Sequence, residues 1–193
     1  MTLKALITDM DGTLVDLGID WDKLREKVRK EMGWDHPLKP LGESIARVAR
    51  NEEEAKKAFS IVEEEEYKAA FNAKRDEELV KLLRSLREKG FKLALVTMQS
   101  LRSTKIVLTR LGVFELFDVV VTRDVTVDRA LQIQTAMRKL NIIQDEAVFI
   151  GDTPRDYEAA KKVGIKFISV GRCYEKSPCV ENFKEIFELL RLK

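Results

Sequence analysis

The chain has 193 residues, of which 35 are Lys or Arg and 33 are Asp or Glu, so its formal net charge at pH 7 is +2. Because positive and negative charges nearly cancel, we expect neither a nucleic-acid partner nor an anionic membrane partner. No apolar stretch approaches the roughly 20 residues that span a bilayer, and the N-terminus lacks the features of a signal peptide. The length is sufficient for one or two domains with a full core.

An apolar run, Leu3 to Thr8, predicts a buried first strand, and the motif Asp9 to Thr13 (Asp-Met-Asp-Gly-Thr) follows it directly. Residues two apart in an extended chain point the same way, so Asp9 and Asp11 would share the carboxyl end of this strand. Gly12 would then allow a sharp turn. Ligands bind at such strand ends in open α/β sheets, although the motif alone is also compatible with an ordinary turn.

Residues 17–75 contain no convincing strand and predict an all-helical insertion. We expect helices from Trp21 to Met32, from about Gly42 to Arg50 and from Glu52 to Ala73. The predicted domains are therefore an α/β core, residues 1–16 and 76–193, and a helical cap, residues 17–75. Within the cap, the tract Glu63 to Glu66 is expected to be a solvated helix face. The only histidine, His36, is expected in a surface turn.

Beyond the cap, strand-like runs alternate with amphipathic helices, which is typical of a parallel sheet with crossovers. The further strands are expected at Phe91 to Thr97, Phe117 to Thr122, Ala147 to Ile150 and Ile165 to Val170. The helices are expected at Asp76 to Lys89, Leu101 to Leu111, Asp128 to Leu140, Pro154 to Val163 and Val180 to Leu192. The predicted fold class is α/β: a Rossmann-like parallel sheet with helices on both faces, plus a small all-helical cap inserted after the first strand. Right-handed crossovers would bring the ends of the first, second and fourth strands to one edge.

A second acidic motif, Gly151 to Asp156, follows the apolar run Ala147 to Ile150. It places Asp152 at a strand end and Asp156 about one helical turn later. Asp152 or Thr153 could simply cap a helix. Carboxylates that converge from two strand ends, however, repel and raise one another's pKa unless a cation relieves them. Oxygen ligands suit Mg²⁺, which often binds beside substrate phosphates, so we predict a magnesium site here.

These motifs resemble those of the haloacid dehalogenase superfamily, the aspartate-nucleophile hydrolases. Asp9 to Thr13 resembles its first motif, Thr97 its second, and Gly151 to Asp156 its last. The segment between the first two motifs resembles the helical cap of the phosphoglycolate-phosphatase-like subgroup. The resemblance implies a Mg²⁺-dependent phosphatase that hydrolyses a small phosphorylated metabolite through an aspartyl-phosphate intermediate.

The resemblance also implies roles for the acidic residues. Asp9 would be the nucleophile, and Asp11 would be general acid and then general base. Asp9 and Asp152 would bind Mg²⁺ through their side chains and Asp11 through its backbone carbonyl. Asp156 would support this metal site.

Three further residues are candidates for contact with the phosphoryl group or the rest of the substrate. Thr97 would donate its hydroxyl to a phosphoryl oxygen, although a β-branched residue at a strand end needs no such role. Thr13 would either cap a helix or orient phosphate. Met98 stands where the family often has Asn or another small polar residue, and would form a larger, apolar wall.

The third motif of the family normally carries a Lys, which here would fall near Val127, yet no lysine lies in residues 122–131. Arg129 is the closest cation, and we predict that it supplies this charge, with a helix-surface position as the alternative. Arg123, which precedes Arg129 in the sequence, is the next closest cation. If neither approaches the substrate, Lys39 or Arg47 of the cap are the next candidates.

Other functions of this fold remain open at this point. A dehalogenase would use Asp9 alone and would need neither Asp11 nor a metal, which argues against it. A phosphomutase would use the same Asp pair. A non-catalytic protein that binds a phosphate ligand or a partner protein is compatible with the missing lysine.

Cys173 and Cys179 do not have the spacing of a metal site or of a disulfide framework. We expect two free thiols and a cytoplasmic protein. A disulfide, as in proteins of hyperthermophiles, is the alternative, weakly favoured by the composition, which is rich in Lys and Glu.

Overall fold

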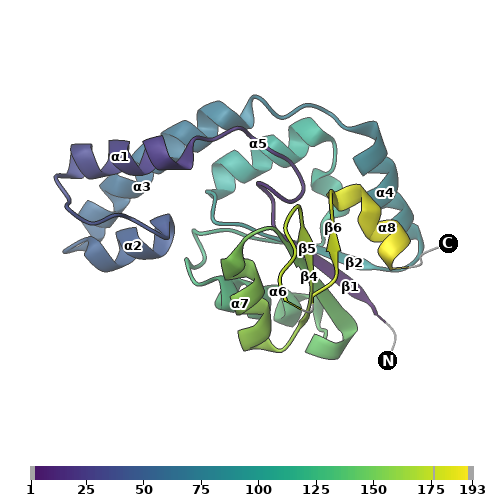
Figure 1. Ribbon diagram of the computed structural model, residues 1–193. Helices are drawn as coiled ribbons and strands as arrows, with labels where there is room; N and C mark the ends of the chain where they lie inside the picture. The colour runs from purple at the N-terminus through teal and green to yellow at the C-terminus, as the bar shows by residue number, and fades with distance from the viewer. Residues whose placement is uncertain (1–2, 176, 191–193) are drawn as a thin grey trace.

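The computed structural model describes residues 3–175 and 177–190, and a parallel sheet of six strands forms its centre (Figure 1). The strand order is β3-β2-β1-β4-β5-β6, so β1 lies between β2 and β4. All neighbouring strands in this sheet are parallel. The strands are β1 (Ala5–Thr8), β2 (Lys92–Val96), β3 (Val119–Val121), β4 (Ala147–Gly151), β5 (Lys166–Val170) and β6 (Cys179–Val180).

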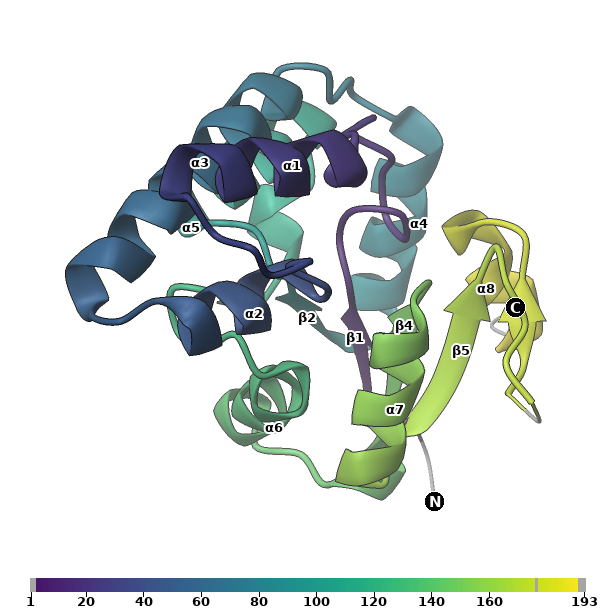
Figure 2. The same ribbon diagram turned by 60° about the vertical axis from the view of Figure 1, so that its left-hand side comes forward.

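Helices cover both faces of the sheet, because successive side chains of each strand point to opposite faces. Leu6 of β1 belongs to a core shared with α4 (Glu77–Glu88), α5 (Leu101–Leu111) and α8 (Ile186–Leu189). Ile7, the next residue, belongs to a second core shared with α6 (Arg129–Leu140) and α7 (Pro154–Val163). Figure 2 shows α6 and α7 together on one side of the strands and α4 and α5 on the other. The predicted fold class is confirmed.

The cap consists of α1 (Trp21–Met32), α2 (Leu41–Val48) and α3 (Glu52–Ala70), which lie to one side of the sheet (Figure 1). These helices have an apolar core of their own, which includes Leu24, Val28, Trp34, Leu38 and Ile45. The C-terminal end of α3 continues into the core of the sheet through Ala69 and Ala70. His36 lies half-buried in the bend between α1 and α2. In the described part of the chain, every helix is too short or too polar to span a bilayer.

The helix predicted from Val180 to Leu192 is wrong over most of its length. Cys179–Val180 instead forms β6, which pairs with Ser169 and Val170 of β5. A short 3-10 helix, Phe183–Glu185, and α8 follow, while Leu192 lies outside the described residues. A two-residue edge strand has too few residues to show a period, so the apolar pattern could not separate it from the helix after it.

The prediction of two free thiols is also wrong. Cys173 and Cys179 form a disulfide, with their Cα atoms 5.2 Å apart. The connection between β5 and β6 brings them together, because the amide of Ser169 binds the carbonyl of Pro178 next to Cys179 (3.0 Å). With this disulfide, the two cysteines no longer indicate a cytoplasmic location.

Candidate active site

The carboxyl ends of β1, β2 and β4 meet at one edge of the sheet, as the crossover argument predicts. Thr8 of β1 is in register with Leu95 of β2 and with Ile150 of β4. The chain continues from these strands into Asp9, Thr97 and Asp152. Asp9 is fixed by its amide, which donates to the carbonyl of Ile150 (2.9 Å), and its side chain is almost fully buried.

Three carboxylates converge at this edge. Oxygen atoms of Asp9, Asp152 and Asp156 lie within 4.8 Å of one another. Gly12 makes this possible, since it has φ +82° and a Cβ at its position would collide with the Asp152 carboxylate. The hydroxyl of Thr13 donates to Asp152 Oδ1 (2.9 Å) and so fixes that side chain.

Asp156 is held in this cluster by the first turn of α7. Its Oδ2 accepts hydrogen bonds from the amide (3.1 Å) and hydroxyl (2.5 Å) of Thr153, which is the N-cap residue of the helix. A Cβ at Gly151 would lie only 2.7 Å from Cβ of Asp156, so a glycine is needed for the helix to approach this closely. Asp156 is therefore as central to the cluster as Asp9 and Asp152.

Arg129, at the first position of α6, reaches into the cluster. Its Nη2 lies 3.1 Å from Asp9 Oδ1 and its Nε 2.9 Å from Asp156 Oδ1, as ion pairs. Its Nη1 donates to the carbonyl of Val96 (3.0 Å) and to Oε1 of Gln132 (3.1 Å). The guanidinium is thus held on several sides in a buried position and joins two acidic residues from different motifs.

Gln132 is a member of this site that the sequence did not predict. Its amide nitrogen donates to the carbonyls of Thr97 (2.8 Å) and Thr126 (2.9 Å), while its oxygen accepts from Arg129. The side chain thereby ties α6 to the loop after β2. It lies one helical turn after Arg129, which is the signal that could have identified it.

The electrostatics of the cluster show an excess of negative charge. Burial raises the pKa of Asp9 to about 8; Arg129 opposes this shift, while Asp156 and Asp152 add to it. Burial also raises the pKa of Asp152 to about 6. Three carboxylates face one guanidinium, and their oxygen atoms are the donor type that hard divalent cations prefer. The cluster therefore fits a divalent metal ion.

Asp11 lies beside this cluster, not in it. It is half-buried, and its Oδ1 accepts a hydrogen bond from the amide of Leu17 (2.9 Å). Burial raises the pKa of its carboxyl above the ordinary value. A carboxyl group in this position is suited to carry a proton.

A cavity of about 840 Å³ opens above these residues, between the sheet edge and the cap. Its floor includes the predicted residues Asp9, Asp11, Thr97, Met98, Arg129 and Asp152. The cap and its connectors contribute Ile19, Trp21, Arg25, Lys39, Leu41, Phe59, Val62 and Glu66. Lys39 therefore lies at the cavity, whereas Arg47 is outside its lining and has Nη2 3.2 Å from Nε2 of His36.

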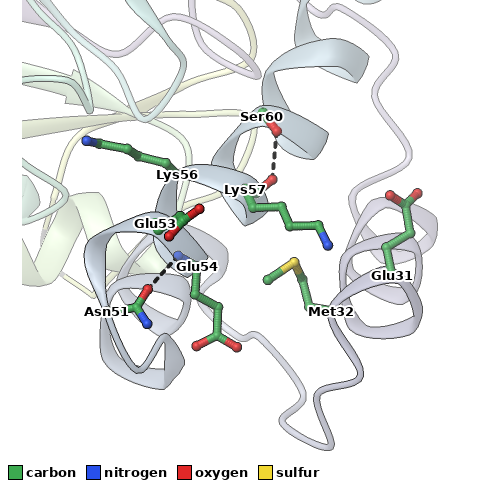
Figure 3. Close-up of a pocket in the computed structure, with 8 residues that line it drawn as sticks. All are labelled: Glu31, Met32, Asn51, Glu53, Glu54, Lys56, Lys57 and Ser60. Atoms are coloured by element: carbon green, nitrogen blue, oxygen red, sulfur yellow. Dashed lines mark hydrogen bonds between the residues drawn. The ribbon is translucent and has the colours of Figure 1, made fainter.

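A second hollow, of about 720 Å³, lies on the cap between the end of α1 and the first half of α3 (Figure 3). Charged side chains such as Glu31, Glu53 and Lys57 surround it. It contains no residue of either acidic motif, so the candidate active site is the cavity at the sheet edge.

Arg123 does not approach the carboxylate cluster. Its Nη1 forms a buried ion pair with Oε1 of Glu66 on α3 (2.5 Å) and donates to the carbonyl of Met98 (3.0 Å). Glu66 is 1% exposed, so the prediction that Glu63 to Glu66 is a solvated face is wrong for this residue. Burial raises the pKa of Glu66 to about 7, although Arg123 opposes the shift. This pair joins the cap to the core at the wall of the cavity.

A family model described as haloacid dehalogenase-like hydrolase matches residues 6–170. The chain belongs to this family. The match includes both acidic motifs and the cap between them.

Two curated relatives that cover most of this hydrolase are phosphatases. A phosphoglycolate phosphatase of Aquifex aeolicus is 29% identical over 85% of this chain and 83% of its own length. A glyceraldehyde 3-phosphate phosphatase of Methanopyrus kandleri is 26% identical over 88% of this chain and 84% of its own length. These findings confirm the resemblance to phosphoglycolate-phosphatase-like members and the prediction of a phosphoric monoester hydrolase.

The fold of this hydrolase is also found in solved structures. The crystal structure of a predicted phosphatase from Clostridium acetobutylicum matches it with a TM-score of 0.74 and 24% identity, over 100% of both chains. The match therefore includes the cap as well as the sheet.

Proposed function

We propose that this hydrolase is a Mg²⁺-dependent phosphatase that acts on a small phosphomonoester through an aspartyl-phosphate at Asp9. The observation that carries the proposal is the cluster of Asp9, Asp152 and Asp156 beneath a capped cavity, in which Arg129 is ion-paired with Asp9 and Asp156. We also propose that residues 17–75 form the cap domain and residues 1–16 and 76–193 the core domain.

In the first half of the proposed reaction, a carboxylate oxygen of Asp9 attacks phosphorus. The bond from phosphorus to the ester oxygen breaks, its electron pair goes to that oxygen, and Asp11 supplies a proton to it. In the second half, Asp11 takes a proton from water as the water oxygen attacks phosphorus. The aspartyl-phosphate bond then breaks, which releases inorganic phosphate and restores the Asp9 carboxylate.

Thr97 would stabilise the transferred phosphoryl group, and Arg129 would act on the nucleophile. The Oγ1 of Thr97 accepts a hydrogen bond from the amide of Gln99 (3.2 Å), so its own hydrogen is directed elsewhere and suits a phosphoryl oxygen. Arg129 would hold Asp9 in position for attack and offset its charge. We assign to Arg129 the place of the third-motif lysine of the family.

Asp9 and Asp152, with the backbone carbonyl of Asp11 and support from Asp156, would hold Mg²⁺. When bound, the ion offsets the charge of the phosphoryl group and of the carboxylates. The position of Asp11 outside the cluster and the number of carboxylates both favour a phosphatase over a dehalogenase. A phosphomutase shares these residues and remains the alternative. We keep a cytoplasmic location as a prediction.

Turnover of p-nitrophenyl phosphate with and without Mg²⁺ tests the proposal. We expect activity that requires Mg²⁺ and is inhibited by Ca²⁺, whose looser coordination misplaces nucleophile and phosphate. Asp9→Asn should abolish turnover and keep the fold, because an amide cannot form the acyl phosphate. Full activity in excess chelator, or more than a trace of activity in Asp9→Asn, would refute this mechanism.

A further inference from the structure

Gln99 lines the active-site cavity with a side chain that is 2% exposed. Its backbone is fixed, since its amide donates to Thr97 Oγ1 (3.2 Å) and its carbonyl accepts from the amide of Arg123 (3.3 Å). Among the described residues, neither the nitrogen nor the oxygen of its carboxamide has a hydrogen-bond partner. Gln99 thus presents a buried, unpaired amide two residues after Thr97.

A buried amide without a partner costs free energy, so an amide in this position calls for an explanation. Gln132, the other buried glutamine of the site, shows the contrast. Its carboxamide binds the carbonyls of Thr97 and Thr126 and the guanidinium of Arg129. Gln132 thus makes the hydrogen bonds that hold α6 to the neighbouring loops. The carboxamide of Gln99 makes none of these bonds, so it is free to bind a ligand in the cavity.

The charges around the cavity indicate which kind of ligand group this is. Every cation that lines the cavity is ion-paired with a carboxylate: Arg25 and Lys39 with Asp22, Arg123 with Glu66, Arg129 with Asp9 and Asp156, and Arg155 with Glu43. Because Arg25 and Lys39 share the single carboxylate of Asp22, this group of three side chains has a net charge of +1. The side chain of Lys39 is 64% exposed, so this positive charge lies at the rim of the cavity. In the buried Glu66–Arg123 pair, Glu66 also accepts from the amide of Ser100 (3.2 Å) and Arg123 also donates to the carbonyl of Met98 (3.0 Å).

We propose that Gln99 is a specificity-determining residue that binds an uncharged oxygen, a hydroxyl or carbonyl, on the leaving part of the phosphomonoester. A carboxamide both donates and accepts hydrogen bonds, which matches a hydroxyl group. Phe59 and Val62 of α3 supply apolar surface for carbon atoms in the same cavity. The proposal rests on the proposed phosphatase function. It favours hydroxylated triose or sugar phosphates over substrates with a second anionic group.

The test compares kcat/KM for glyceraldehyde 3-phosphate and for phosphoglycolate in the wild type, in Gln99→Leu and in the control Gln134→Leu. Gln134 is an exposed glutamine on α6, outside the cavity lining. The wild type should prefer glyceraldehyde 3-phosphate. Gln99→Leu should lower the ratio of the two kcat/KM values by roughly tenfold, mainly through KM, because one hydrogen bond is lost. Gln134→Leu should leave the ratio unchanged.

A purely structural role for Gln99 predicts a different result. Since leucine removes an unpaired buried amide, the free enzyme of Gln99→Leu should be at least as stable to urea as the wild type. An unchanged substrate ratio, or a less stable variant that loses activity equally on both substrates, overturns the proposal. A wild type that prefers phosphoglycolate also overturns it.

Failure of the proposed function is distinguishable from failure of this inference. If the wild type hydrolyses neither of these esters nor p-nitrophenyl phosphate, the phosphatase function fails. Calorimetric titration of Asp9→Asn with glyceraldehyde 3-phosphate then judges Gln99 separately. Binding that is roughly tenfold weaker with Gln99→Leu added supports the subsite. If glyceraldehyde 3-phosphate binds Asp9→Asn and the double variant equally well, the inference is overturned. It is also overturned if Asp9→Asn, which keeps Gln99, does not bind this ligand.

Discussion

Replacement of Arg129 by Ala tests our assignment of this residue to the place of the third-motif lysine. The guanidinium contacts Asp9, Asp156, the carbonyl of Val96 and Gln132, and all these contacts are buried. Its removal would leave buried carboxylates without their cation. Such a loss typically costs about 3–5 kcal/mol of stability.

The expected effect on catalysis follows from the same contacts. A positioned cation that offsets charge in the transition state, here at the attacking carboxylate of Asp9, typically contributes several kcal/mol to its stabilisation. Loss of about 3 kcal/mol corresponds to a fall in rate of roughly a hundredfold. Arg129→Lys should recover part of this loss, because an ammonium keeps the charge but cannot make all the contacts of the planar fork.

The assay is kcat/KM for p-nitrophenyl phosphate in saturating Mg²⁺, at a temperature where urea denaturation shows each variant folded. Arg138→Ala is the matched control, since Arg138 is an exposed arginine on the same helix. Arg123→Ala should lower stability, because it breaks the buried pair with Glu66, but should change the rate of the folded enzyme little. If Arg129→Ala keeps more than about a tenth of the wild-type kcat/KM, the assignment of Arg129 to the third-motif position is wrong.

Three further predictions concern the metal site, the disulfide and the cap. Asp152→Ala should weaken Mg²⁺ binding in calorimetry with the circular dichroism spectrum unchanged; unaltered affinity would remove Asp152 from the metal site. Because the disulfide closes a short loop, Cys173→Ser should lower the free energy of unfolding by about 2 kcal/mol. A reductant should have no further effect on the stability of this variant. Equal stability of variant and wild type would contradict the prediction. Glu66 has its pKa raised from 4.5 to about 7 by burial, so the folded state binds its proton more tightly than the unfolded state. Its contribution to stability is therefore full below about pH 4.5 and is lost as pH rises to about 7. Relative to Glu66→Gln, the free energy of unfolding of the wild type in urea should fall by up to about 3 kcal/mol over this pH range. If the unfolding free energies of the two proteins depend on pH in the same way, the raised pKa of Glu66 is disproved.

Local motifs made much of the site predictable from the sequence. Asp9 and Asp152 each follow a short apolar run, and parallel strands with right-handed crossovers bring their carboxyl ends to one edge. The prediction of Arg129 rests on the family resemblance as well, because Arg129 is the cation closest to the expected place of the third-motif lysine. In each case a residue's position is set by the strand or helix to which it is attached, so the sequence around it carries the information.

Only the tertiary structure decided how distant side chains pair within the cavity. Glu66 and Arg123 are 57 residues apart, and the acidic tract on α3 shows no sign that one of its members is buried. Cys173 and Cys179 are joined because the chain between β5 and β6 turns back on itself. Gln99 and Gln132 are both buried, but only one has partners for its amide. Pairing of this kind depends on distances set by the packing of whole elements, and no local period or spacing in the sequence encodes those distances.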